Sequence, residues 1–104
     1  MSSELRRSSL FTAEVLRQFG WYADKAGEDV AWRFEAAVEE TLLAIARQPE
    51  LGRLRHFKNP RLSQLRSIPV TRPFNKLIIF YRAERDTVEA WRLMHGARDL
   101  PRRL

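Results

Sequence analysis

The run Leu77-Ile-Ile-Phe-Tyr81 constrains the fold most strongly, because an extended segment there carries apolar side chains on both faces. A strand of that kind lies inside a sheet that is covered on both sides. Two further β-type runs flank it, Leu65–Thr71 before and Thr87–His95 after a short turn. The short turn favours a hairpin of antiparallel neighbours. We therefore expect a three-stranded antiparallel sheet whose central strand covers Lys76–Glu84.

Two helices are predicted ahead of this sheet. Apolar residues recur at three- and four-residue spacing over 15–26 and again over 30–45. Gly27 separates the two stretches as a left-handed helix cap would, and Pro49 stops the second near Arg47. So short a joint folds the two helices back on each other as an antiparallel hairpin.

The N-terminal segment completes the predicted fold. Residues 5–11 indicate a short strand, with Thr12 as the cap of the first helix and Glu14 in its first turn. Because the sheet must bury one face against the helices, the whole chain, 1–104, is predicted to be one α+β domain of two layers. Residues 50–62 are predicted to be a loop, and Pro69 indicates an edge position or a bulge.

Composition limits the partners and the chemistry. The net charge of +6 and the pI near 10.7 favour an acidic partner, either nucleic acid or an acidic protein segment. With no cysteine and only His56 and His95, neither a metal site nor a cofactor is expected. The apolar runs are too short to cross a membrane, and we expect a cytoplasmic protein.

Four segments, in this order, resemble the ParE branch of the RelE/ParE toxin superfamily of type II toxin–antitoxin systems. They are Ala44-Ile-Ala-Arg-Gln-Pro-Glu-Leu-Gly52, Leu65-Arg-Ser-Ile-Pro-Val70, Leu77-Ile-Ile-Phe-Tyr-Arg82 and His95-Gly-Ala-Arg-Asp99. The resemblance implies a toxin neutralised by a cognate antitoxin with an acidic or amphipathic C-terminal segment. It also implies DNA gyrase as the target of a ParE-type toxin. RelE-type members instead cleave mRNA on the ribosome.

The choice between these activities depends on side chains, since one fold carries both. RelE-type members use clustered lysines and arginines with a C-terminal tyrosine, whereas this chain has no tyrosine after Tyr81 and only three lysines. We therefore expect inhibition by binding rather than catalysis. The alternatives are a metal-free endoribonuclease that uses His95, Arg92 and Arg98, and a basic binding module without toxicity.

Basic residues near the C-terminus are the predicted target-binding set: Arg82, Arg92, His95, Arg98, Arg102 and Arg103. Tyr81 is expected to belong to the hydrophobic core rather than to a binding site. A second basic group, in the 50–62 segment, is either a solvated surface or a contact for nucleic acid. It comprises Arg53, Arg55, His56, Lys58 and Arg61.

Three tryptophans form the predicted antitoxin-binding set, Trp21, Trp32 and Trp91. So small a domain has little room to bury three indoles on divergent faces, and exposed aromatic patches mark interfaces. The alternative is that the indoles only cover the edge of the core.

Overall fold

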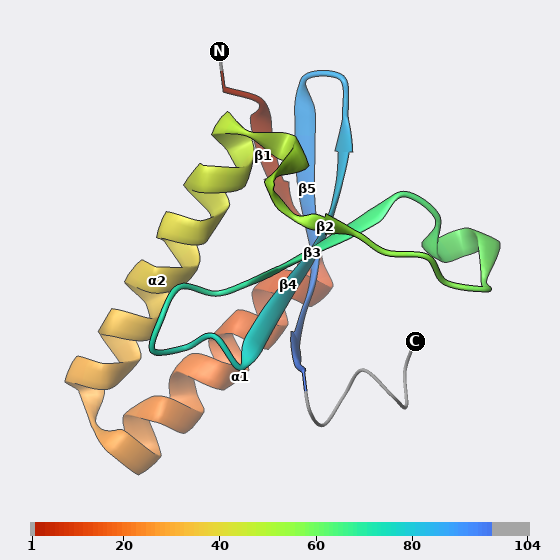
Figure 1. Cartoon of the computed structure of the whole chain (residues 1–104). Coiled ribbons are helices and arrows are strands. Elements are labelled where there is room, and N and C mark those ends of the chain that lie inside the picture. The colour runs from red at the N-terminus through yellow and green to blue at the C-terminus, as the bar shows by residue number, and fades with distance from the viewer. Residues whose placement is uncertain (1, 97–104) are drawn as a thin grey trace.

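The computed structural model of the protein describes residues 2–96 of the chain. In this part, two helices pack on one face of a five-stranded sheet, which confirms the α+β fold of two layers (Figure 1). The helices are α1 (Ser9–Ala26) and α2 (Glu28–Arg47), and the strands are β1 (Glu4–Arg7), β2 (Arg53–Leu54), β3 (Leu65–Pro69), β4 (Leu77–Glu84) and β5 (Thr87–His95).

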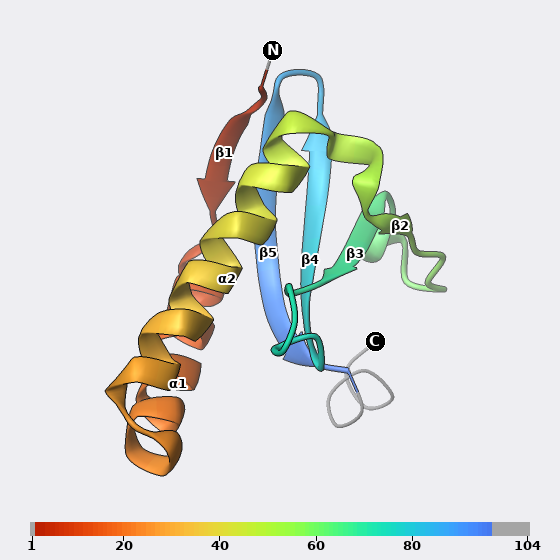
Figure 2. The ribbon, with the colours of Figure 1, turned by 60° about the vertical axis from the view of Figure 1, so that its left-hand side comes forward.

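The strands follow the order β1-β5-β4-β3-β2 across the sheet (Figure 2). As predicted, β4 is central and pairs antiparallel with both β3 and β5. The N-terminal strand β1 joins the outer edge of β5 in parallel, with Leu5 opposite Val88. The sheet is therefore mixed, and its N-terminal strand pairs with the strand that comes last among those described.

The prediction of a loop over 50–62 was wrong in part. Strand β2 lies inside it and pairs with Arg66 and Ser67 of β3, while Pro49–Leu51 and Pro60–Leu62 form short 3₁₀ turns. Two residues of strand leave no periodic pattern, because their pairing depends on a distant segment. Since β2 does not reach Pro69, that proline lies on an exposed edge of β3, as predicted.

The first helix begins earlier than the sequence indicated. The predicted strand over 5–11 is present only as far as Arg7, as β1. The prediction that Thr12 caps the helix was wrong, because Ser8 caps it and its Oγ accepts the Phe11 N–H at 3.0 Å. Serine is among the preferred N-cap residues, so the helix starts directly after it. Glu14 consequently lies beyond the first turn, where its carboxylate contacts β5.

The joint between the helices is as predicted. Gly27 has a φ of +100°, a conformation that favours glycine, and its N–H donates to the Tyr22 carbonyl at 3.0 Å. The second helix ends at Arg47, before Pro49. The two helices therefore form the predicted antiparallel hairpin, and both lie on the same side of the sheet (Figures 1 and 2).

A β-bulge interrupts the last hairpin. Tyr81 lies opposite Ala90 and Phe80 opposite Arg92, which leaves Trp91 as the extra residue of β5. Strict alternation along β5, which would place Trp91 on the same face as Leu93, is therefore broken at the bulge. Alternation assumes an unbroken pleat, and here both Ala90 and Leu93 belong to the core.

The core fills the space between the helix hairpin and the sheet. Its fully buried side chains come from every layer, and removing such apolar surface from water is the main stabilising term. They include Phe11, Phe34, Leu42, Ile45, Ile79, Tyr81 and Val88. Neither described helix is long and apolar enough to cross a membrane.

Candidate functional site

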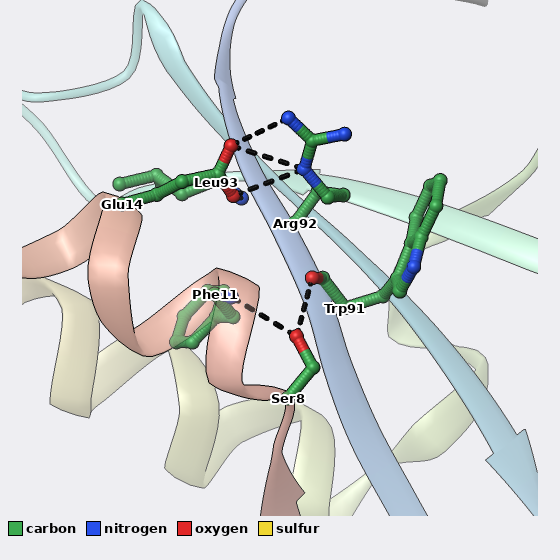
Figure 3. Close-up of polar contacts among 6 residues, drawn as sticks. All are labelled: Ser8, Phe11, Glu14, Trp91, Arg92 and Leu93. Carbon is green, nitrogen blue, oxygen red and sulfur yellow. Dashed lines mark hydrogen bonds and ion pairs between the residues drawn. The ribbon is translucent and has the colours of Figure 1, made fainter.

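Arg92, a predicted target-binding residue, is held by Glu14 of α1 (Figure 3). Its Nη2 donates to Oε2 at 2.7 Å, and its Nε lies 3.0 and 3.1 Å from the two carboxylate oxygens. The Leu93 N–H donates to the same carboxylate at 2.9 Å. Both charged side chains are only 12% exposed. The pair is a largely buried, bidentate contact between helix and sheet, which leaves little of the Arg92 side chain exposed.

Ser8 extends the same attachment towards β1. Its N–H donates to the Ala90 carbonyl at 2.9 Å, and its Oγ donates to the Trp91 carbonyl at 2.7 Å (Figure 3). Beyond the end of β1, Ser8 and Glu14 thus provide the hydrogen-bond partners for backbone groups on the outer edge of β5. These contacts fix the start of α1 against the bulge.

Arg82 also contacts backbone. Its Nε donates to the Ser63 carbonyl at 3.2 Å, and its Nη2 donates to the carbonyl of Arg61. The guanidinium therefore holds the segment that leads into β3. Two arginines of the predicted target-binding set, Arg82 and Arg92, make contacts that stabilise the fold.

Tyr81 is fully buried, which confirms it as core. Its hydroxyl donates to the Pro49 carbonyl and accepts the Gly52 N–H, both at 2.7 Å. Burial raises the pKa of this hydroxyl above its ordinary value. The tyrosine thereby connects the central strand to the exit of α2, and it couples two of the segments that carried the family resemblance.

His95 ends β5 opposite Leu77 and lines a cleft of about 610 Å³. The cleft lies between α1 and the adjoining ends of β4 and β5. Its cationic and aromatic lining includes Arg17, Trp21, Tyr22, Phe74, Lys76, Arg92 and His95. Of the predicted sites, the structure therefore brings His95 and Arg92 together with Trp21.

A second hollow, of about 320 Å³, runs between α1 and α2. We call it the helix groove, and it is lined by Arg7, Phe11, Thr12, Val15, Leu16, Phe19, Trp32, Glu35 and Glu39. Trp32 is 60% exposed and meets Phe19 edge to face, with ring centroids 4.9 Å apart. The groove has an apolar floor and a charged rim.

The rim of the helix groove contains an ion pair between β1 and α2. Arg7 donates from Nη1 and Nη2 to the two carboxylate oxygens of Glu39, at 2.6 and 2.8 Å. The hydrogen bond from Arg7 lowers the pKa of the Glu39 carboxyl. Glu35 adds a second carboxylate to the same rim.

The three tryptophans lie in different places. Trp32 lines the helix groove, and Trp21 lines the cleft at His95. Trp91 lies at the bulge, and the Arg92 guanidinium carbon is 5.7 Å from the centroid of the Trp91 ring. Trp21 is 50% exposed and Trp32 60%, so each presents a large part of its indole to solvent.

The basic residues before β3 differ in their surroundings, because one packs on the sheet and the others are exposed. Arg55 donates to the Ser67 hydroxyl at 3.1 Å and lies 5.8 and 6.0 Å from the ring centroids of Phe57 and Phe80. It therefore packs on the sheet face opposite the helices. The other members, Arg53, His56, Lys58 and Arg61, are exposed.

Three predicted residues, Arg98, Arg102 and Arg103, lie outside the described residues. Within residues 2–96, no group of three histidine, aspartate or glutamate side chains could hold a metal ion. Sequence reasoning missed Ser8 and Glu14, because the contacts of Glu14 reach Arg92 and Leu93, 78 and 79 positions away. The sequence offered one signal for this contact, namely that serine at position 8 is a preferred N-cap residue and could mark the start of the helix.

The fold is similar to that of one chain in a solved structure. A chain of the solved structure titled "Chromosomal ParDE TA system from P. aeruginosa" matches with a TM-score of 0.72 over 90% of this chain and 96% of that one. The two sequences are 14% identical, so this likeness concerns the fold. A search of curated proteins finds no match.

The family follows from the sequence match. The family model described as ParE toxin of type II toxin-antitoxin system, parDE, matches residues 5–100. The chain belongs to this family, which confirms the resemblance drawn from its four segments.

Proposed function

We propose that this ParE toxin acts by binding DNA gyrase, without cleaving RNA, and that a cognate antitoxin neutralises it by occupying the helix groove. The observation that carries the first part is the Glu14–Arg92 pair. A metal-free nuclease needs cations free to stabilise a scissile phosphate and groups free to move protons. Here the guanidinium of Arg92 is already bound by a carboxylate, and Arg82 by backbone carbonyls.

Tyr81 supports the same proposal. A nuclease could use a tyrosine as a proton donor, but the hydroxyl of Tyr81 is buried between Pro49 and Gly52. The exposed basic residues Arg53, Lys58 and Arg61 remain for a binding surface. Charged surfaces of this kind steer and orient an acidic partner without any chemical step.

Expression in growing bacteria tests the target. We expect pulse-labelled DNA synthesis and plasmid negative supercoiling to fall before protein synthesis does, since gyrase maintains supercoiling ahead of replication. The control is the Glu14→Ala variant, whose expected loss of stability should weaken both effects. If protein synthesis fell first, with cleaved mRNA, the gyrase proposal would be wrong and the RelE-like alternative would stand.

The chemistry of the helix groove specifies the antitoxin segment. Its floor offers apolar side chains with Trp32 exposed above them, while its rim has Glu35 and Glu39. Helix α2 as a whole contains five acidic and two basic residues. An amphipathic antitoxin segment with apolar anchors and a lysine or arginine beside them fits this groove, whereas an acidic segment fits the basic surfaces elsewhere.

Replacing Trp32 with alanine tests the groove. Because exposed indoles are frequent hot spots, we expect the affinity for the antitoxin to fall by about tenfold or more. Leu43→Ala is the matched control, since Leu43 is also exposed on α2 but does not line the groove. Isothermal titration with purified antitoxin measures both. Equal affinities for the two variants would place the antitoxin elsewhere.

A further inference from the structure

We propose that the cleft at His95 binds a nucleotide, with its base stacked on Trp21 and its phosphate held by Arg17 and Lys76. The inference concerns a different surface from the helix groove. It also does not depend on gyrase being the target, because binding is measured with isolated toxin.

The charge of the cleft is the first argument. Among the described residues, Glu14 is the one carboxylate in its lining, and Arg92 and the Leu93 N–H already bind it. Among residues 2–96, no carboxylate forms an ion pair with Arg17 or Lys76. The lining therefore keeps two positive charges that no described carboxylate compensates, beside His95, and such a site attracts a phosphate.

The exposed indole is the second argument. Trp21 is 50% exposed and meets Tyr22 edge to face, with centroids 5.3 Å apart and an angle of 77° between the rings. Tyr22 in turn contacts Phe74 and Phe34, at 5.3 and 5.2 Å. The indole therefore adjoins a packed aromatic cluster and is half exposed where it lines the cleft. Bases stack on such surfaces whatever their identity.

The combination identifies the ligand class. An acidic peptide would use the cations but gain little from the indole, whereas a nucleotide has a planar base and a phosphate in one unit. The volume of about 610 Å³ is within the range of small-molecule sites. The unit could come from a free nucleotide or from a single strand of nucleic acid, and the experiment separates these sources.

Binding is measured by fluorescence anisotropy with a labelled oligothymidylate, of about eight nucleotides, as the probe. Unlabelled ATP and inorganic phosphate are the competitors. Displacement by ATP but not by phosphate indicates that the site accepts a free nucleotide. Probe binding that ATP does not reverse indicates a strand. Absence of probe binding at low salt, together with absence of ATP binding by titration calorimetry, would overturn the proposal.

Charge-matched variants locate the site. We expect Arg17→Gln with Lys76→Gln to weaken binding by about tenfold or more and to reduce its salt dependence. The control is Arg33→Gln with Arg47→Gln, which removes the same charge from exposed positions on α2. We expect it to change affinity by less than about threefold. Equal losses in both double variants would mean non-specific attraction and would overturn the proposal.

The indole requires a separate test. Trp21→Ala should weaken binding by about fivefold or more, and Trp21→Phe should restore most of it, because a smaller ring still stacks. Thermal unfolding checks that each variant remains folded, as expected for a half-exposed side chain. Undiminished binding by a folded Trp21→Ala variant would contradict the stacking. Displacement of the probe by oligoglutamate as readily as by ATP would show an acidic-peptide site instead.

Discussion

Replacing Glu14 with alanine is expected to destabilise the protein by about 3–5 kcal/mol, because it leaves the Arg92 guanidinium buried without its counter-charge. The two side chains are each 12% exposed, so water can replace little of the lost contact. The change also removes the acceptor of the Leu93 N–H at the edge of β5. A domain of this size has a total stability of about 5–15 kcal/mol, so this loss would be a large share of the total.

Urea denaturation followed by circular dichroism measures this loss. The control is Glu40→Ala, which removes a carboxylate from an exposed position on α2 and should change stability by less than about 0.5 kcal/mol. Replacing the pair together, Glu14→Leu with Arg92→Met, should recover most of the stability, because no unpaired charge remains buried. If Glu14→Ala unfolded at the same urea concentration as Glu40→Ala, the pair would not hold the helix to the sheet.

The second large effect is expected at Gly52. A Cβ there would lie 2.5 Å from the Tyr81 hydroxyl oxygen and 2.6 Å from its Cε1. The ring is fully buried and bonded through its hydroxyl on both sides, so it has no free space to move into. Overpacking of this kind costs about 1–3 kcal/mol, and weakening the two hydroxyl hydrogen bonds adds to it.

Gly20→Ala is the matched control for Gly52→Ala. Gly20 lies inside α1, and a Cβ there meets no atom within 4 Å. Alanine in a helix interior should stabilise by about 0.5–1 kcal/mol, so the two changes have opposite expected signs. In a Tyr81→Phe background, Gly52→Ala should cost less stability, because the Tyr81 hydroxyl oxygen, the atom nearest to the added Cβ, is absent. If the stability losses of the two single changes simply added in the double variant, the glycine would have a role other than making room for Tyr81.

Gly52 also shows what a sequence motif means physically. Its φ of −74° is ordinary extended backbone, so this position does not need a glycine for its conformation. The need arises from the close approach of Tyr81, 29 residues later. The Pro-x-x-Gly segment and the Phe-Tyr-Arg segment, which both carried the family resemblance, thus contact each other through Tyr81. The sequence of either segment alone does not reveal this contact.

Local patterns predicted most of the fold. The helical periods, the turn at Gly27 and the two-sided apolar run at Leu77–Tyr81 each determine structure within a few residues, and all three predictions were confirmed. The positions of β2 and of the bulge at Trp91 were not predicted, because they depend on register between distant segments. The helix cap was misplaced because both Ser8 and Thr12 suit that position.

The candidate sites were harder to predict than the fold. A count of arginines could not distinguish Arg92, bound by Glu14, from Arg17, which lines an open cleft. Likewise, three tryptophans in the sequence indicated one patch, whereas the fold separates them among a groove, a cleft and a bulge. Charge and aromatic content thus indicated a binding protein, and only the three-dimensional arrangement separates its surfaces.

The central claim is that this ParE toxin inhibits gyrase by binding. Supercoiling of relaxed plasmid by purified gyrase, with increasing amounts of purified toxin, tests it most directly. We predict that supercoiling is lost as toxin is added and returns when antitoxin is added in excess, while mRNA in a parallel purified translation reaction stays intact. Unchanged supercoiling with ribosome-dependent cleavage of the mRNA would contradict the claim.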